Sequence, residues 1–196
     1  MSQPSPIYRY ATHSRACLDR ARAQLARFDA DDDVEALLNA ALQLRYGIEA
    51  RVWEYLEVAL RQLGQDPGVV PDYVASKLLR RLAAADPHSG RASVLMMRDE
   101  QSGATSSLQY TPVPGALAAL HGRLGELLHH RLFVANKHWY VRRALPFGGS
   151  QSLGNFRELL SEGIAGLEYA TSGTLLANPK FTEMVSDVMQ GPSGND

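Results

Sequence analysis

One long apolar stripe constrains the fold of this chain more than any other feature. Apolar residues recur at helical spacing from residue 34 to residue 63, and Gly64 follows as a stop signal. A helix of this length would extend roughly 45 Å at 1.5 Å per residue, which is enough to cross a whole domain. We therefore expect it to be the central member of a helical bundle. The stripe consists of Val34, Leu37, Leu38, Ala41, Leu42, Ile48, Val52, Leu56, Leu60 and Leu63.

Four more segments predict helices around this central one. Helical periodicity extends over residues 7–28, 71–85, 115–133 and from residue 150 or 152 to about 176. A fifth, short amphipathic segment at 181–189 follows Asn178-Pro179. The predicted fold is all-α, an up-and-down bundle of about five helices that forms a single domain over residues 7–190. Residues 1–6 and 191–196 are expected to be flexible tails.

Residues 91–111 predict a small β-hairpin inserted into the bundle. Val94-Leu95-Met96-Met97 and the segment 106–111 flank a polar stretch that contains Gly103. A two-stranded hairpin alone is marginal in water. We therefore expect it to lie on the helices or to pair with a second subunit; a disordered loop is the alternative.

Composition excludes several classes of protein. Lys+Arg 20 against Asp+Glu 21 gives a net charge of -1, which argues against a chain coated in nucleic acid but permits a local basic patch. No apolar run approaches a membrane span, and no signal peptide is expected at residues 1–6. The single Cys17 excludes an internal disulfide and a multi-cysteine zinc site, and we expect the protein to be cytoplasmic.

The residues that could transfer protons or bind phosphate are concentrated between residues 121 and 143. Four of the six histidines lie there with arginine, lysine and aromatic side chains, and Glu126 is the only acid among them. Histidine changes its charge near neutral pH, and arginine binds phosphate through a planar fork. This window contains His121, Arg123, His129, His130, Arg131, Lys137, His138, Trp139, Tyr140, Arg142 and Arg143.

Helical phase separates these residues along the predicted helix at 115–133. His121 and Arg131 fall in the buried sector with the leucines, whereas Arg123 and His130 share one edge. Gly122 and Gly125 lie on another side, close to the line of His129, and predict that a neighbouring helix approaches there. In the preceding long helix Arg45 and Glu49 stand four residues apart, either as an exposed pair or as a partly buried pair that faces the site.

One use of such a set is RNA cleavage without a metal ion. A histidine would take the proton from a ribose 2′-hydroxyl while an arginine stabilises the charge on the phosphate. The alternative is that these are hydrogen-bonded structural side chains. No cofactor is predicted: adjacent histidines diverge on a helix and cannot readily share one metal ion, and the sequence has no Gly-x-Ser-x-Gly elbow and no glycine-rich phosphate loop.

Three short stretches carry a resemblance to a known family. They are Cys17-Leu18-x-x-Ala21, the segment from Ala40 to Glu49 (AALQLRYGIE), and Leu124-Gly125-x-Leu127-Leu128-His129. Together they resemble the HEPN-like group, named for higher eukaryote and prokaryote nucleotide-binding proteins, including its abortive-infection type. The resemblance extends over about residues 7–63 and 117–132.

The resemblance implies a dimeric all-α bundle whose active members carry an Arg-x(4–6)-His motif at a composite RNase site. Arg123 to His129, Arg123 to His130 and Arg131 to His138 all fit that spacing, with Leu124 where the commoner motif has a polar residue. Arg45 and Glu49 would then support catalysis. The implied function is a metal-independent endoribonuclease in phage defence or a toxin–antitoxin system, with an antitoxin or other protein partner. RNA would be held by Arg131, Lys137, His138, Trp139, Arg142 and Arg143. The alternative is a non-catalytic helical dimer that binds a protein or a nucleotide.

Overall fold

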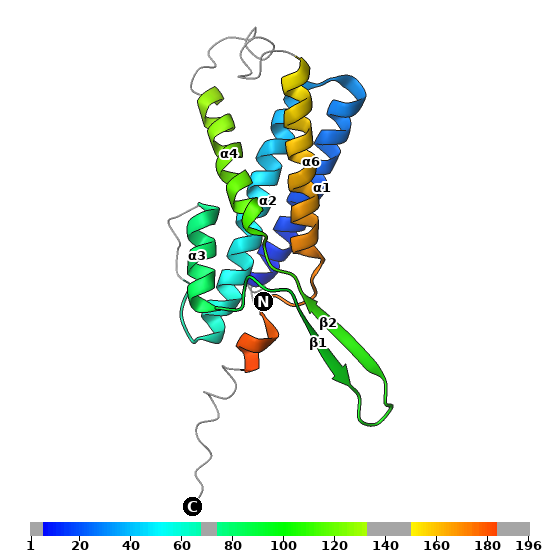
Figure 1. The fold of residues 1–196 in the computed structure, drawn as a ribbon, viewed down its shortest axis with the longest axis vertical. Coiled ribbons are helices and arrows are strands. Elements are labelled where there is room, and N and C mark those ends of the chain that lie inside the picture. The colour runs from blue at the N-terminus through cyan, green and yellow to red at the C-terminus, as the bar shows by residue number, and fades with distance from the viewer. Residues whose placement is uncertain (1–5, 68–73, 133–149, 184–196) are drawn as a thin grey trace, which may run out of the picture.

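The fold of this chain, given by a computed structural model, is a helical bundle from which one β-hairpin projects (Figure 1). The structure describes residues 6–67, 74–132 and 150–183. The predicted helical bundle with a small hairpin is confirmed. The helices are α1 (Pro6–Asp31), α2 (Val34–Gln62), α3 (Ala75–Ala85), α4 (Gly115–Leu132) and α6 (Ser150–Ser172), and a further helical turn begins at residue 179.

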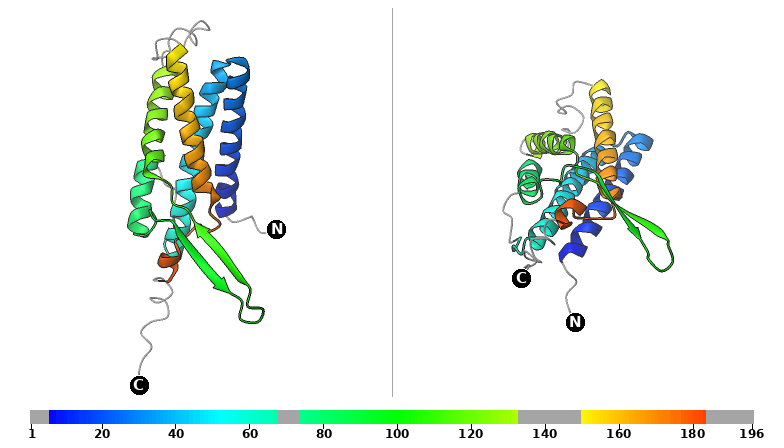
Figure 2. Two further views of the ribbon diagram at one scale, coloured as in Figure 1. Left: turned by 45° about the vertical axis from the view of Figure 1, so that its right-hand side comes forward. Right: turned by 60° about the horizontal axis from the view of Figure 1, so that its bottom comes forward.

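The long helix α2 lies at the centre, as its stripe predicted. It packs along α1 and also contacts α3, α4 and α6. Helices α1 and α4 run upward in Figure 1, and α2 and α6 run downward. Figure 2 shows the same four helices from two further sides. Asp33 begins α2, because its side chain accepts hydrogen bonds from the backbone N–H groups of Glu35 and Ala36. Gly64, with a φ of +68°, ends it.

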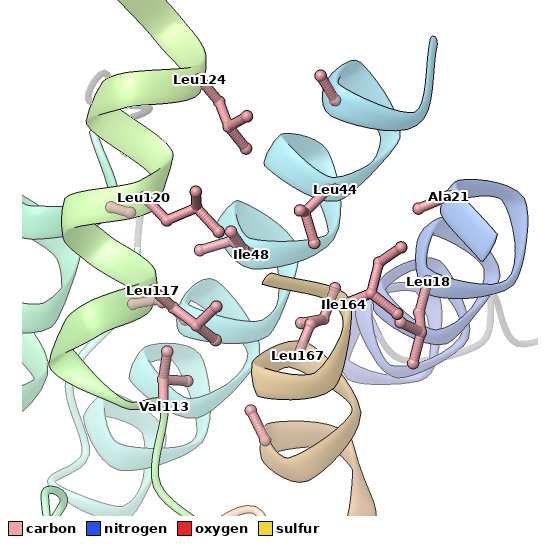
Figure 3. Packing of buried hydrophobic residues seen from close by; sticks show 14 of the residues in the cluster. Leu18, Ala21, Leu44, Ile48, Val113, Leu117, Leu120, Leu124, Ile164 and Leu167 are labelled. Carbon is pink, nitrogen blue, oxygen red and sulfur yellow. The ribbon is translucent and has the colours of Figure 1, made fainter. Parts of the chain in front are cut away.

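Leucine, isoleucine and alanine side chains from α1, α2, α4 and α6 fill one continuous core. Leu44 and Ile48 of α2 lie between Leu120 of α4 and Leu167 of α6 (Figure 3). Cys17 is fully buried, as its place on the packing face predicted. Burial raises the pKa of its thiol despite a hydrogen bond from Arg20.

Glycines of α6 allow α4 and α6 to approach closely. A β-carbon at Gly163 would meet Leu120 and would lie 2.6 Å from Cδ2 of Leu44, and one at Gly166 would lie 2.9 Å from Cδ2 of Leu117. The expectation that Gly122 serves this purpose is not met within residues 6–67, 74–132 and 150–183, because Gly122 is exposed and no atom of another segment in those ranges lies within 4 Å of its β position. The contact face of α4 carries leucines, so the small residues stand on its partner.

Strands β1 (Ser93–Arg98) and β2 (Thr105–Tyr110) form the predicted hairpin, paired antiparallel from Ser93↔Tyr110 to Arg98↔Thr105. Asp99 shapes the turn by accepting hydrogen bonds from the N–H groups of Gln101 and Ser102 at 2.9 and 2.7 Å. The hairpin projects away from the helices instead of lying on them (Figure 2).

Helix α6 ends at Ser172, four residues before the predicted end near residue 176. Gly173 packs against Thr111, where a β-carbon would lie 2.6 Å from the hydroxyl oxygen. Thr174 and Leu175 then donate their N–H groups to the carbonyl of Gln109, and Leu175 forms a parallel bridge with Tyr110. Pairing with the root of the hairpin therefore replaces the last helical turn that periodicity predicted.

Two smaller boundaries also differ from the sequence prediction. Helix α3 begins at Ala75, whereas Pro71, its predicted first residue, lies outside the described residues. The C-terminal helical turn begins at residue 179, where the Asn178 side chain accepts a hydrogen bond from the N–H of Lys180. None of the described helices combines the length and apolarity that a membrane span requires.

Candidate functional site

Arg45 and Glu49 form a partly buried ion pair on the face of α2 that meets α4. The guanidinium Nε lies 3.2 Å from Oε1 of Glu49, and the two side chains are 20% and 14% exposed. Their spacing of four residues places both on one side of the helix. Of the two sequence interpretations, the structure supports the partly buried pair.

His121 of α4 joins this pair and completes a three-residue polar cluster. Its Nε2 lies 2.6 Å from Oε1 of Glu49 and 3.3 Å from Nε of Arg45, and its side chain is 5% exposed. The carboxylate can only accept, so the shortest contact requires a proton on Nε2. The same Glu49 oxygen then accepts from both His121 and Arg45. The hydrogen bond from His121 to the Glu49 carboxylate joins α4 to α2, and the bond from Arg45 to Glu49 lies within α2.

Gly125 of α4 lies beside the Arg45 side chain. A β-carbon at this position would lie 3.5 Å from Nη1 and 3.6 Å from Cζ of Arg45. These are ordinary van der Waals distances to a side chain, so the close helix approach predicted at Gly125 is not found among the described residues. Position 129 follows Gly125 by one helical turn, so the helix repeat puts positions 121, 125 and 129 on the side of α4 that faces Arg45.

Arg123 lies on a different side of α4, toward α6. It is exposed and borders a groove of about 300 Å³ whose wall on α6 includes Leu159, Glu162 and Gly163. Its guanidinium makes no ion pair or hydrogen bond within the described part of the chain. Position 130 lies two turns further along the same edge of the helix. The structure brings Arg45 and Glu49 together with His121, and leaves Arg123 on the neighbouring face.

A second polar cluster, which sequence reasoning missed, lies deep in the bundle. Arg51 donates to the Ala170 carbonyl at 2.8 Å, to Oε2 of Glu54 at 2.7 Å and to the Tyr55 hydroxyl at 2.8 Å. Tyr55 in turn donates to the carbonyl of Thr111 at 2.5 Å. Arg51 stands near Ile48, Val52 and Tyr55 on the inner side of α2. A charged residue among these apolar positions was the sequence signal that could have predicted a buried polar cluster.

This deep cluster is a structural junction and not a reaction site. Arg51, Glu54 and Tyr55 are almost completely buried, so no substrate reaches them. Burial raises the pKa of Glu54, and Arg51 opposes that effect. The junction joins α2, the end of α6 and the residue that follows β2.

Part of the predicted site lies outside the described residues. This applies to Lys137, His138, Trp139, Arg142 and Arg143, and to the side chains of His129, His130 and Arg131, whose backbone belongs to α4. Within the described part of the chain, no three histidine, cysteine or carboxylate side chains are grouped as ligands for a metal ion.

Comparison of the chain with protein-family models, with curated proteins and with solved structures yields no match.

Proposed function

We propose that this protein is a HEPN-like, metal-independent endoribonuclease that acts as a homodimer in the cytoplasm, in phage defence or a toxin–antitoxin system. The observation that carries the proposal is the exposed Arg123 guanidinium. It is not used for internal contacts of the described chain, and it lies on the helical edge that position 130 shares. An arginine held this way is available to bind a phosphate, and a histidine two turns along the helix is within reach of the same nucleotide.

In this proposal the reaction uses acid–base chemistry on the ribose. His130 or His129 takes the proton of the 2′-hydroxyl, whose oxygen attacks the adjacent phosphorus. Arg123 stabilises the negative charge on the phosphoryl oxygens, and a histidine of the second subunit protonates the departing 5′-oxygen. Lys137, His138, Trp139, Arg142 and Arg143, together with Arg131, hold the RNA by charge and stacking.

The cluster of Arg45, Glu49 and His121 supports the site indirectly. It fixes the rotation of α4 about its own axis, because the hydrogen bond from His121 to Glu49 joins one side of α4 to α2, and Arg45 holds the Glu49 carboxylate in place. That rotation determines where the exposed edge of Arg123 points. Arg45 and Glu49 are therefore positioning residues in this proposal.

The decisive experiment is incubation of the purified protein with total RNA and with tRNA in the presence of EDTA. We expect cleavage that Arg123→Ala and His130→Ala each reduce by at least about 100-fold, the scale for loss of one charge-stabilising group. Arg98→Ala, at the tip of the hairpin, removes the same charge from another exposed site and is the matched control. Absence of EDTA-resistant cleavage, or an equal loss in Arg98→Ala, would refute the nuclease.

A second candidate function is a non-catalytic helical dimer that binds a protein or a nucleotide. The observation that favours protein binding is the projecting hairpin with its exposed Val94 and Met96. This candidate predicts no cleavage of any RNA, together with binding that hairpin substitutions weaken and Arg123→Ala does not.

A further inference from the structure

The free edge of β1 is an unusual surface for an isolated protein. Val94 is 58% exposed and Met96 is 63% exposed, and both side chains lie on the face of the hairpin that carries Ser107 and Gln109. Moving methionine and valine side chains out of water lowers the free energy of the protein. A two-stranded ribbon without cover is marginally stable. This hairpin is anchored only at its root within the described chain.

The backbone of β1 also has hydrogen-bonding capacity left over. The N–H of Asp99 donates to the carbonyl of Ala104, so Asp99 belongs to the residues bonded across to the other arm. Because successive residues of a strand alternate, residues 94, 96 and 98 direct their N–H and C=O groups to the outer edge. At the outer edge of β2, Gln109 is already bonded to Thr174 and Leu175. β1 is therefore the edge with the longer open run for another strand, residues 94, 96 and 98.

The charges along this edge favour one occupant, a second copy of the same strand. Exposed Arg91 stands just before β1, and exposed Asp99 and Glu100 stand just after it. An antiparallel second copy places each Arg91 near the acidic pair of its neighbour, whereas a parallel copy places like charges together. Exposed ion pairs add little affinity but select orientation and partner.

We propose that two copies of this protein associate through antiparallel pairing of their β1 strands, which gives a four-stranded sheet with a two-fold axis near Met96. Residues 94, 96 and 98 supply the new ladder, and the exposed Val94 and Met96 side chains of the two copies cover one another. The hairpin lies at the end of the bundle opposite to the C-terminal end of α4 (Figure 1). This contact is therefore separate from the proposed nuclease site and does not depend on it.

Sedimentation velocity between about 1 and 200 µM tests the pairing. We expect a concentration-dependent doubling of mass, from monomer to dimer or from helix-paired dimer to tetramer, whose dissociation constant rises at least tenfold in Met96→Lys, because the two charges would meet at the axis. Ser107→Lys is the matched control, since Ser107 pairs with Met96 across the hairpin and on the same face, but on the strand that is not used. It should shift the constant less than threefold. A mass that does not change with concentration, or equal effects of the two lysines, would overturn the proposal.

Spin labels distinguish this pairing from association through the helices. Cys17 is buried, so a cysteine introduced as Met96→Cys or Ser102→Cys takes the label selectively. Labels at 96 should lie within about 20 Å of each other, and labels at 102, at the far end of each hairpin, about 30–40 Å apart, from a strand rise of about 3.3 Å per residue. The reverse order would overturn antiparallel β1 pairing. The Arg123→Ala variant should associate like the wild type, which keeps this test independent of the nuclease.

Discussion

The spacing between α4 and α6 can be tested by adding a single methyl group. Gly163→Ala puts a β-carbon against Leu120, and 2.6 Å from Cδ2 of Leu44. Gly154→Ala, on the same helix, adds the same group where no atom of another segment in the described part of the chain lies within 4 Å of the β position. The two substitutions share their helix-propensity effect and differ in packing alone.

The expected magnitude follows from that difference. Alanine is about 1 kcal/mol better than glycine inside a helix, so Gly154→Ala should raise the free energy of unfolding by about 0.5–1 kcal/mol. Gly163→Ala gains the same amount but overpacks the core, which costs about 1–3 kcal/mol. The gap between the two variants is then the overpacking cost by itself, about 1–3 kcal/mol.

Urea denaturation of the two variants, followed by circular dichroism, measures this gap. In a thermal melt of a chain of 196 residues, each kcal/mol of difference in stability corresponds to about 2–4 °C in melting temperature. Gly163 also borders the groove beside Arg123, so the same variant should alter the surroundings of that side chain. Equal stability of Gly163→Ala and Gly154→Ala would refute the close approach of α4 and α6.

Two further substitutions test the polar contacts. Tyr55→Phe should lower the free energy of unfolding by about 1–3 kcal/mol in urea, because buried Arg51 loses an acceptor and the Thr111 carbonyl loses a donor; a change below about 0.3 kcal/mol would contradict the junction. Arg157 holds the pKa of Asp29 below its ordinary value of 3.8, so their pair stabilises the fold above that pH and loses its effect as the pH falls through the lowered pKa. Asp29→Asn should therefore be less stable than the wild type at pH 6, and the difference should disappear in acid; a difference that persists there would contradict it.

Local patterns predicted the helices well because their periodicity is strong. The apolar stripe of α2 and the burial of His121 on the inner face of α4 both follow from the helical repeat. The end of α6 did not follow from local pattern, because contacts of residues 173–175 with Gln109 and Thr111 decide it.

The polar clusters were also predictable only where their residues are close in the sequence. The spacing of Arg45 and Glu49 indicated a pair, but no local rule connects Glu49 with His121, which is 72 residues away. Likewise, the glycines of α6 that admit Leu117 and Leu120 carry no mark in the sequence that separates them from Gly122. Which segment packs against a glycine depends on the tertiary arrangement, and this information is absent from a short sequence motif.

The junction around Tyr55 links the projecting hairpin to the melting of the whole bundle. Its hydroxyl joins α2 to Thr111, directly after β2, while Tyr110 lies against the same ring with centroids 5.2 Å apart. The first rungs of the hairpin ladder therefore cannot open unless the interior of the bundle opens as well. Amide protons near Tyr110 should then exchange with solvent only in the global unfolding reaction, whereas those beyond Met97 should exchange through local fraying.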